Sequence, residues 1–224
     1  LLFGDDLSYT LNMASIENGS VISNGVNVEL TKEENFKSNP IQVNKTFDIA
    51  DGRQVGYLMY NQFVADKSDD LNNIFGLFNN KNINDLIIDL RYNGGGSVKN
   101  CVELASMITG QFKSEVFAKE QWNKKLISYL EKRFGSESLI NRFVDTLSNG
   151  SQINSLNLDR VYMITSSESA SASELLINGL SSYIEVIQIG ERTVGKNVGS
   201  ITVYDYVDNE QTKNPDHTYA MQPI

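Results

Sequence analysis

The sequence predicts an α/β fold that is built on parallel strands. The apolar run 55–60 is typical of a buried strand, and the apolar residues of 71–78 follow helical spacing. A second apolar run, 85–90, leads through a glycine turn into a helical pattern over 98–109. A strand, a helix and a second strand in this order form a βαβ unit, in which the two strands are parallel.

The start of the chain predicts a separate β-rich segment. Alternating residues over 7–14 and 26–30 indicate two strands that are joined by a turn. The polar stretch 32–51 is interpreted as a linker into the main domain. We therefore place a boundary near residue 45, between an N-terminal segment over 1–45 and a core over 46–224.

Residues 111–158 form an insertion in which two amphipathic helices, separated at Gly135, are expected. These helices either pack against the core, which we favour, or form a lid or substrate platform. Alternation over 201–207 and 219–222 predicts a final pair of strands. The apolar positions of the two expected helices are Trp122, Leu126, Tyr129, Leu130 and Phe134, and then Leu139, Ile140, Phe143, Val144 and Leu147.

The composition fits a globular protein and excludes several classes of function. The 224 residues are 40% hydrophobic, and no apolar run approaches the ~18 residues that a membrane-spanning helix needs. A net charge of −9 argues against nucleic acids and anionic membranes as partners. The only cysteine, Cys101, cannot form an intrachain disulfide and is assigned to the core. Together with the only histidine, His217, it leaves too few ligands for a zinc site, so we expect no metal or cofactor.

The segment 165–174, with the sequence T-S-S-E-S-A-S-A-S-E, is the first candidate for chemistry. A strand-like run over 160–165 enters a tight turn of small residues, and a helix opens near Glu174. A hydroxyl on such a turn lies beside backbone N–H groups that have no helical partner. That position suits a nucleophilic serine and the oxyanion that it would create. The alternative is that these serines cap the helix and allow close packing.

A second candidate, Lys196, lies between the loop-forming residues Gly195 and Asn197, after an apolar run over 184–189. A lysine can replace histidine as the base for a serine when its amine is neutral. The reference pKa of lysine, about 10.4, leaves well under ~1% of the neutral form at pH 7. Such a base must therefore lie in a closed, apolar site. The scarcity of histidine independently favours a lysine.

The turn 93–97, with the sequence N-G-G-G-S, is the third candidate. Its glycines let the backbone approach a ligand closely and present N–H groups to an anion. It matches neither GxxxxGK[ST] nor GxGxxG, so it is a poor candidate for a nucleotide phosphate loop. Arg91, at the end of the preceding strand, is expected to pair with a carboxylate such as Asp89 or Glu174, because a buried guanidinium must be paired.

Together these three segments resemble the catalytic core of the S41 serine peptidases, which are the carboxyl-terminal processing or tail-specific proteases. The matching text is D-L-R-Y-N-G-G-G over 89–96, S-A-S-A-S-E over 169–174 and G-E-R-T-V-G-K over 190–196. The resemblance runs from about residue 54 to 199 and is poor between about 112 and 158. It implies a ClpP/crotonase-like spiral of ββα units with parallel strands, plus the helical insertion.

The resemblance implies a Ser/Lys dyad and an oxyanion hole. The family's nucleophile falls on Ser171 and its general-base lysine falls on Lys196, at the family's spacing of 25 residues. The oxyanion donors fall on the N–H of Ala172 and on an N–H from the glycine turn. Gly96 is the first choice for that second donor, and Gly95 is the other candidate.

Two positions depart from the family's pattern. The glutamine that orients the lysine in many members is Ser200 here, and an aspartate that some members place eleven residues after the serine is Ser182. Ser200 is therefore the candidate for orienting the amine, and low activity is one expected consequence. The alternatives are a catalytically weak or inactive binding module on the same fold, as in the retinoid-binding relatives, and an acyl-CoA enzyme of the crotonase type.

The activity that the resemblance implies is that of a serine endopeptidase acting on polypeptides, in their C-terminal regions. Family members are mostly exported in bacteria, which implies a periplasmic or cell-envelope location. Many carry a PDZ domain before the core, so residues 1–45 are either the last strands of such a domain plus a linker or a hairpin of the core. The chain begins at Leu1 inside folded-looking sequence, without a charged n-region or a cleavage site, so we expect a fragment of a longer protein. The oligomeric state is not predicted.

Overall fold

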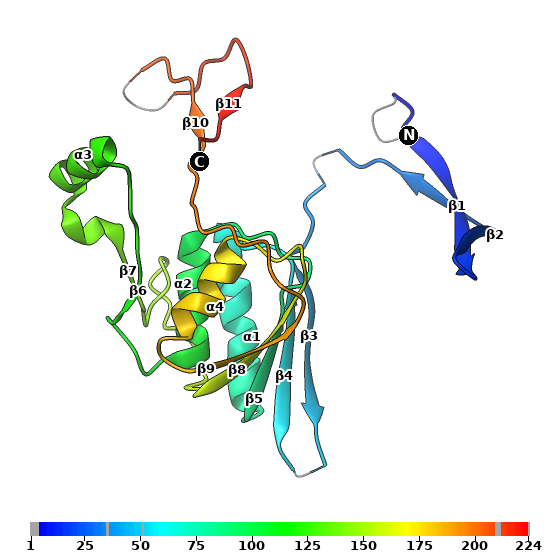
Figure 1. The fold of residues 1–224 in the computed structure, drawn as a ribbon, viewed down its shortest axis with the longest axis horizontal. Coiled ribbons are helices and arrows are strands. Elements are labelled where there is room, and N and C mark those ends of the chain that lie inside the picture. The colour runs from blue at the N-terminus through cyan, green and yellow to red at the C-terminus, as the bar shows by residue number, and fades with distance from the viewer. Residues whose placement is uncertain (1–4, 35, 51, 209–211, 224) are drawn as a thin grey trace. The chain divides into compact units, whose positions relative to one another are not determined.

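The computed structural model describes residues 5–34, 36–50, 52–208 and 212–223. The chain divides into two compact units, Leu1–Asn39 and Pro40–Ile224. In the first unit, β1 (Ser8–Glu17) and β2 (Ser20–Thr31) form an antiparallel hairpin (Figure 1). Asn18 and Gly19 have φ values of 50° and 81°, as a two-residue Asn-Gly turn requires. The hairpin predicted at the start of the chain is confirmed.

The second unit is organised around a five-stranded sheet with the strand order β3-β4-β5-β8-β9. The strand β3 is antiparallel to β4, whereas the other four strands run parallel to one another. The predicted α/β fold with a parallel sheet is confirmed. The glycine turn and the serine turn follow the carboxyl ends of two neighbouring strands, β5 and β8, so they meet at one edge of the sheet. The strands are β3 (Ile41–Asp48), β4 (Gln54–Tyr60), β5 (Asp85–Asp89), β8 (Arg160–Thr165) and β9 (Glu185–Gly190).

The strand β3 contradicts the interpretation of residues 32–51 as a linker. It pairs with β4 along its length, and the boundary that we expected near residue 45 falls inside it. The chain divides instead between Asn39 and Pro40. The polar sequence of β3 has a physical reason: the strand lies at the edge of the sheet, and only Ile41 among its residues is buried.

Three helices lie side by side against the sheet: α1 (Ser68–Asn80), α2 (Val98–Thr109) and α4 (Ala172–Leu180) (Figure 1). Cys101, on α2, is fully buried in this core, as predicted, and its burial raises the pKa of the thiol. The side chains that the strands and helices bury together include Leu58, Leu86, Ile88, Val161, Met163, Phe75, Leu104, Met107 and Leu176.

A short 3-10 turn, η1 (Ala65–Lys67), precedes α1, and no side chain caps the start of this helix. The Ser68 hydroxyl donates to Glu103 on α2. Among the described residues, no group of three or more histidine, cysteine or acidic side chains could hold a metal ion. In the same part of the chain, no helix combines the length and apolar character needed to cross a bilayer.

The insertion contains one of the two predicted helices. The helix α3 (Lys124–Phe134) is present, but a 3-10 turn, η2 (Ser136–Leu139), and the strand β7 (Ile140–Arg142) replace the second. A short apolar run is compatible with both helical and strand periodicity. Here the segment pairs with β6 (Val116–Lys119) and therefore forms a strand. No residue of α3 is buried, so the interpretation that this helix packs against the core is wrong. Near the end of the chain, β10 (Val203–Tyr204) and β11 (Ala220–Met221) form the last predicted pair.

Candidate active site

Ser171 lies at the turn between β8 and α4 and has a strained backbone. Its φ is 58° and its ψ is −113°, an unusual conformation for a residue that carries a side chain. Backbone strain of this kind costs about 1–3 kcal/mol and persists only where the surrounding contacts hold it. A serine on a sharp turn from a strand into a helix is also the arrangement that presents a nucleophile in many hydrolases.

The three serines of the S-A-S-A-S-E motif have different environments. Ser169 and Ser173 are fully buried, and their hydroxyls donate to the backbone carbonyls of Leu90 (2.7 Å) and Asn93 (2.8 Å). Ser171 is half-buried, and no group among the described residues accepts its hydroxyl proton. Only Ser171 is therefore both reachable and free to donate its proton to a base.

The glycine turn after β5 lies directly against Ser171. A Cβ atom added to Gly95 would come within 2.7 Å of the Ser171 Cβ, and one added to Gly96 would come within 2.1 Å of the Phe63 carbonyl oxygen. Both glycines also have positive φ, 105° and 136°. Glycine is required at position 95 for the backbone to approach Ser171 this closely, and at position 96 for the backbone to pass the Phe63 carbonyl.

The backbone N–H groups around Ser171 differ in whether they are already bonded. The N–H of Gly95 donates to the Oδ1 atom of Asn93 at 2.9 Å, so it is not free for a ligand. Within the described part of the chain, the N–H groups of Gly96 and Ala172 have no acceptor. Of the predicted oxyanion donors, Gly96 and Ala172 thus remain available, whereas Gly95 shapes the turn.

The carboxylate of Glu174 joins the serine turn to the lysine loop. Its Oε2 atom accepts the backbone N–H of Ser171 at 2.8 Å and that of Lys196 at 2.9 Å, and its Oε1 atom accepts the N–H of Gly195 at 2.5 Å. Burial raises the pKa of the Glu174 carboxyl, but hydrogen bonds from Thr193 and these three N–H groups outweigh burial and hold the pKa below its usual value. The carboxylate is therefore charged throughout the neutral range.

Lys196 is half-buried, and among the described residues no carboxylate pairs with its Nζ atom. No described hydrogen bond joins this atom to the Ser171 hydroxyl or to Ser200. The backbone N–H groups of Ser171 and Lys196 thus share the Oε2 atom of Glu174 as acceptor, whereas no described hydrogen bond joins their side chains. Hydrogen bonds between catalytic groups are often long before substrate binds. His217 lies beside Asp205, where its Nε2 atom is 3.3 Å from a carboxylate oxygen.

The predicted pairing of Arg91 with Asp89 is confirmed, but the buried charge is the carboxylate: the Arg91 side chain, which was expected to be buried, is 45% exposed. Asp89 is fully buried, and its carboxylate accepts hydrogen bonds from Arg91 (2.7 Å to Nη2) and from the Tyr57 hydroxyl (2.7 Å). Burial raises the pKa of the Asp89 carboxyl, but these hydrogen bonds outweigh burial and hold it below its usual value. This pair stabilises the strand end from which the glycine turn departs.

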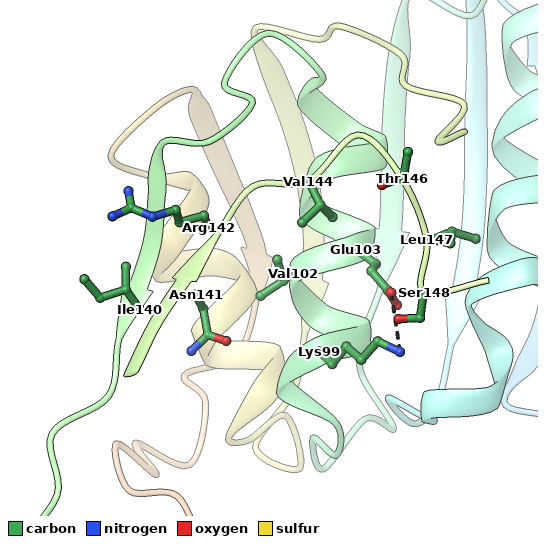
Figure 2. A pocket seen from close by; sticks show the side chains of 10 residues that line it. All are labelled: Lys99, Val102, Glu103, Ile140, Asn141, Arg142, Val144, Thr146, Leu147 and Ser148. Carbon is green, nitrogen blue, oxygen red and sulfur yellow. Dashed lines mark ion pairs between the residues drawn. The ribbon is translucent and has the colours of Figure 1, made fainter. Parts of the chain in front are cut away.

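A pocket of about 270 Å³ lies between the first half of α2 and the segment around β7 (Figure 2). Lys99 and Glu103 line it on the α2 side, and their charged groups are 3.8 Å apart. Arg142 lines the opposite side, where it pairs with Glu137. Neither Ser171 nor Lys196 belongs to the lining, so this pocket is separate from the serine turn.

The geometry around Ser171 defines a class: an α/β protein with a strained serine, free N–H groups beside it and a lysine loop tied to the same turn. The chain also matches the family model of peptidase family S41 over residues 54–219, so it belongs to that family. No curated protein matches the chain.

Solved structures agree with this assignment. A Bacteroides fragilis protein assigned to the S41 proteases is 25% identical, with a TM-score of 0.73, and covers 91% of this chain. The photosystem II D1 C-terminal processing protease (20% identity, TM-score 0.54, 80% of this chain) and mature CPAF (15%, 0.52, 78%) share the fold. The chain covers 52%, 43% and 46% of these proteins, respectively, and thus spans about half of their length.

Proposed function

We propose that this chain carries the catalytic centre of a serine-type peptidase, with Ser171 as nucleophile and Lys196 as general base. The observation that carries this proposal is the shared Glu174 oxygen, which accepts the N–H groups of both residues. Two loops that are distant in the sequence are held together at the point where the chemistry needs them. Ser171 is also the only serine of its motif whose hydroxyl is not bonded to a backbone carbonyl.

The proposed reaction begins when the neutral amine of Lys196 removes the proton from Ser171 Oγ as this oxygen attacks a peptide carbonyl. The N–H groups of Gly96 and Ala172 receive the developing oxyanion, and each such donor is worth about 3 kcal/mol of the barrier. The protonated amine then gives its proton to the leaving amine of the substrate. Water, activated by the same lysine, releases the acyl group from the serine.

Three finer predictions belong to this proposal. The substrate is a polypeptide, and the family resemblance supports the proposal that cleavage occurs in C-terminal regions. The same resemblance is the basis for proposing a location outside the cytoplasm, in the bacterial periplasm or cell envelope. Ser200 stands where many members have the glutamine that orients the lysine, and without a described bond between Ser200 and Lys196 we expect weak activity rather than none.

The experiment compares Ser171→Ala with Ser167→Ala, an exposed serine of the same turn. Hydrolysis of an unfolded polypeptide should disappear in Ser171→Ala and persist in Ser167→Ala, while both variants unfold at the temperature of the wild type. Hydrolysis that survives Ser171→Ala would remove Ser171 as the nucleophile. A wild-type protein that neither cleaves polypeptides nor reacts with a fluorophosphonate would favour the binding-module alternative.

A further inference from the structure

We propose that Asn93 is a positioning residue that sets the two oxyanion donors in place, an inference that rests on the proposed function. Asn93 lies at the start of the glycine turn and is fully buried. Its backbone N–H donates to the carbonyl oxygen of Leu90 (3.0 Å), and it makes four further hydrogen bonds, two through its side chain and two through its backbone carbonyl. These bonds reach both turns that supply the donors, so a single residue determines their relative positions.

The side chain of Asn93 holds the glycine turn. Its Nδ2 atom donates to the carbonyl oxygen of Tyr60 at the end of β4 (2.8 Å), and its Oδ1 atom accepts the N–H of Gly95 (2.9 Å). The two partners determine the orientation of the amide, because the reverse orientation would place oxygen against oxygen and N–H against N–H. With the Gly95 N–H directed inward and bonded, the next N–H, that of Gly96, is left free.

The backbone carbonyl of Asn93 holds the serine turn. It accepts the N–H of Ala170 at 3.2 Å and the hydroxyl of Ser173 at 2.8 Å. These two residues flank the pair Ser171–Ala172, which contains the nucleophile and the second donor. Asn93 is therefore bonded on both sides of the serine turn and to the residue before Gly96.

This arrangement predicts an effect on the transition state rather than on substrate binding. A donor that is displaced by a fraction of an ångström still contacts a neutral carbonyl but stabilises the oxyanion less well. Loss of the Asn93 amide would also leave the buried N–H of Gly95 without an acceptor, which favours rotation of the turn. Turnover should fall while the Michaelis constant changes little.

Asn72 provides a matched control. It is 6% exposed, and its amide also links a backbone carbonyl to a backbone N–H: Nδ2 donates to Gln152 (3.0 Å), and Oδ1 accepts from Asn154 (2.7 Å). It joins α1 to the 152–154 loop, and among the described residues no hydrogen bond joins it to either donor turn. A purely structural role for Asn93 would make the two asparagines equivalent.

The experiment measures kcat, KM and the unfolding temperature for Asn93→Ala and Asn72→Ala with a polypeptide substrate. We expect a roughly 100-fold loss of kcat in Asn93→Ala with KM within about threefold of the wild type. Asn72→Ala should lower the unfolding temperature to a similar extent and keep kcat within about twofold. Equal losses of kcat in the two variants would overturn the positioning role.

A second variant, Ser173→Ala, keeps the test decisive if Asn93→Ala does not fold. It removes a single buried hydroxyl and with it one of the two bonds that hold the Asn93 carbonyl. We expect kcat to fall about tenfold with KM unchanged, and an unchanged kcat would overturn the proposal. Hydrolysis that survives Ser171→Ala would instead show that the proposed function itself has failed, so the two failures can be distinguished.

Discussion

Two regions of the second unit place polar and apolar side chains in opposite ways. Around the serine turn, polar groups are buried and bonded: Asn93, Ser169 and Ser173 are fully buried, and each bonds to the backbone of another segment. In α3, apolar groups face the solvent, and Tyr129 and Phe134 are 51% and 60% exposed. The first region depends on individual hydrogen bonds, whereas the second contributes little to the core. Substitutions should therefore have large effects in the first region and small effects in the second.

Outside the proposed pair of Ser171 and Lys196, the largest effect is expected at Glu174, whose carboxylate holds the serine turn and the lysine loop together. Glu174→Ala should lower kcat/KM for polypeptide cleavage at least about 100-fold, because Ser171, Gly195 and Lys196 lose the acceptor of their N–H groups. The control is Glu168→Ala, an exposed carboxylate of the same turn. If the two variants retain similar activity, the link between the loops is not needed for catalysis.

The state of this carboxylate also decides how a pH profile is interpreted. The pKa of Glu174 is held below its usual value, so its contribution to stability is present above the unfolded pKa of about 4.3 and is lost only as the pH falls through the lower folded value. A decrease in wild-type activity between pH 8 and pH 5 would therefore not come from protonation of Glu174.

A smaller effect is expected for Tyr57→Phe, which removes one hydrogen bond to the buried carboxylate of Asp89. The free energy of unfolding should fall by about 2 kcal/mol at pH 7. Because the pKa of Asp89 is held below its unfolded value, this stabilisation is present above about pH 3.9 and is lost as the pH falls through the folded value.

Denaturant unfolding of Tyr57→Phe at several pH values tests this prediction against Tyr162→Phe. Tyr162 lies on β8, and its hydroxyl makes no hydrogen bond among the described residues. The difference in the free energy of unfolding between Tyr57→Phe and the wild type should become smaller at acidic pH. Tyr162→Phe should have the same free energy of unfolding as the wild type at every pH. A difference that does not depend on pH would mean that the Asp89 carboxylate is not the group that Tyr57 stabilises.

The smallest effect is expected in α3. Leu126→Ser and Phe134→Ser should each change the free energy of unfolding by less than about 0.5 kcal/mol, because both side chains are exposed. Leu104→Ala, in the buried core, should by comparison cost about 3 kcal/mol. A loss above about 1 kcal/mol in either α3 variant would show that this helix is packed after all.

The same α3 variants test the lid or substrate-platform hypothesis. With the packing interpretation excluded for α3, its exposed apolar residues are expected to contact protein substrates. Cleavage of a protein substrate should then weaken in the double variant, whereas cleavage of a short peptide should not change. If the double variant cleaves the protein substrate as fast as the wild type does, the lid or substrate-platform hypothesis is wrong.

Features that depend on local pattern were predictable from the sequence. The parallel strands follow from runs of buried residues, and the pairing of Arg91 with Asp89 follows from the cost of leaving a buried charge unpaired. Features that depend on which segments become neighbours were not predictable. Pairing with β4 makes β3 a strand despite its polar sequence, and pairing with β6 makes β7 a strand despite its helical spacing.

The site shows the same division. The motifs singled out Ser171 and Lys196, but they did not reveal that Glu174 joins the two loops, because this depends on where residues 195–196 return in space. Asn93 had a local signal that was overlooked: an asparagine two residues before Gly95 readily accepts its N–H. The bond to Tyr60, which fixes the orientation of that amide, becomes visible only in the folded chain.

Site mapping with a fluorophosphonate tests the central claim most directly, because the reagent needs both a free serine hydroxyl and a base that activates it. Mass spectrometry of the wild-type protein at pH 8 should show one adduct, on Ser171. The variant Lys196→Met should unfold at the same temperature as the wild type and should show no adduct. An adduct on another serine, or undiminished labelling of Ser171 without the lysine amine, would contradict the proposed pairing of Ser171 with Lys196.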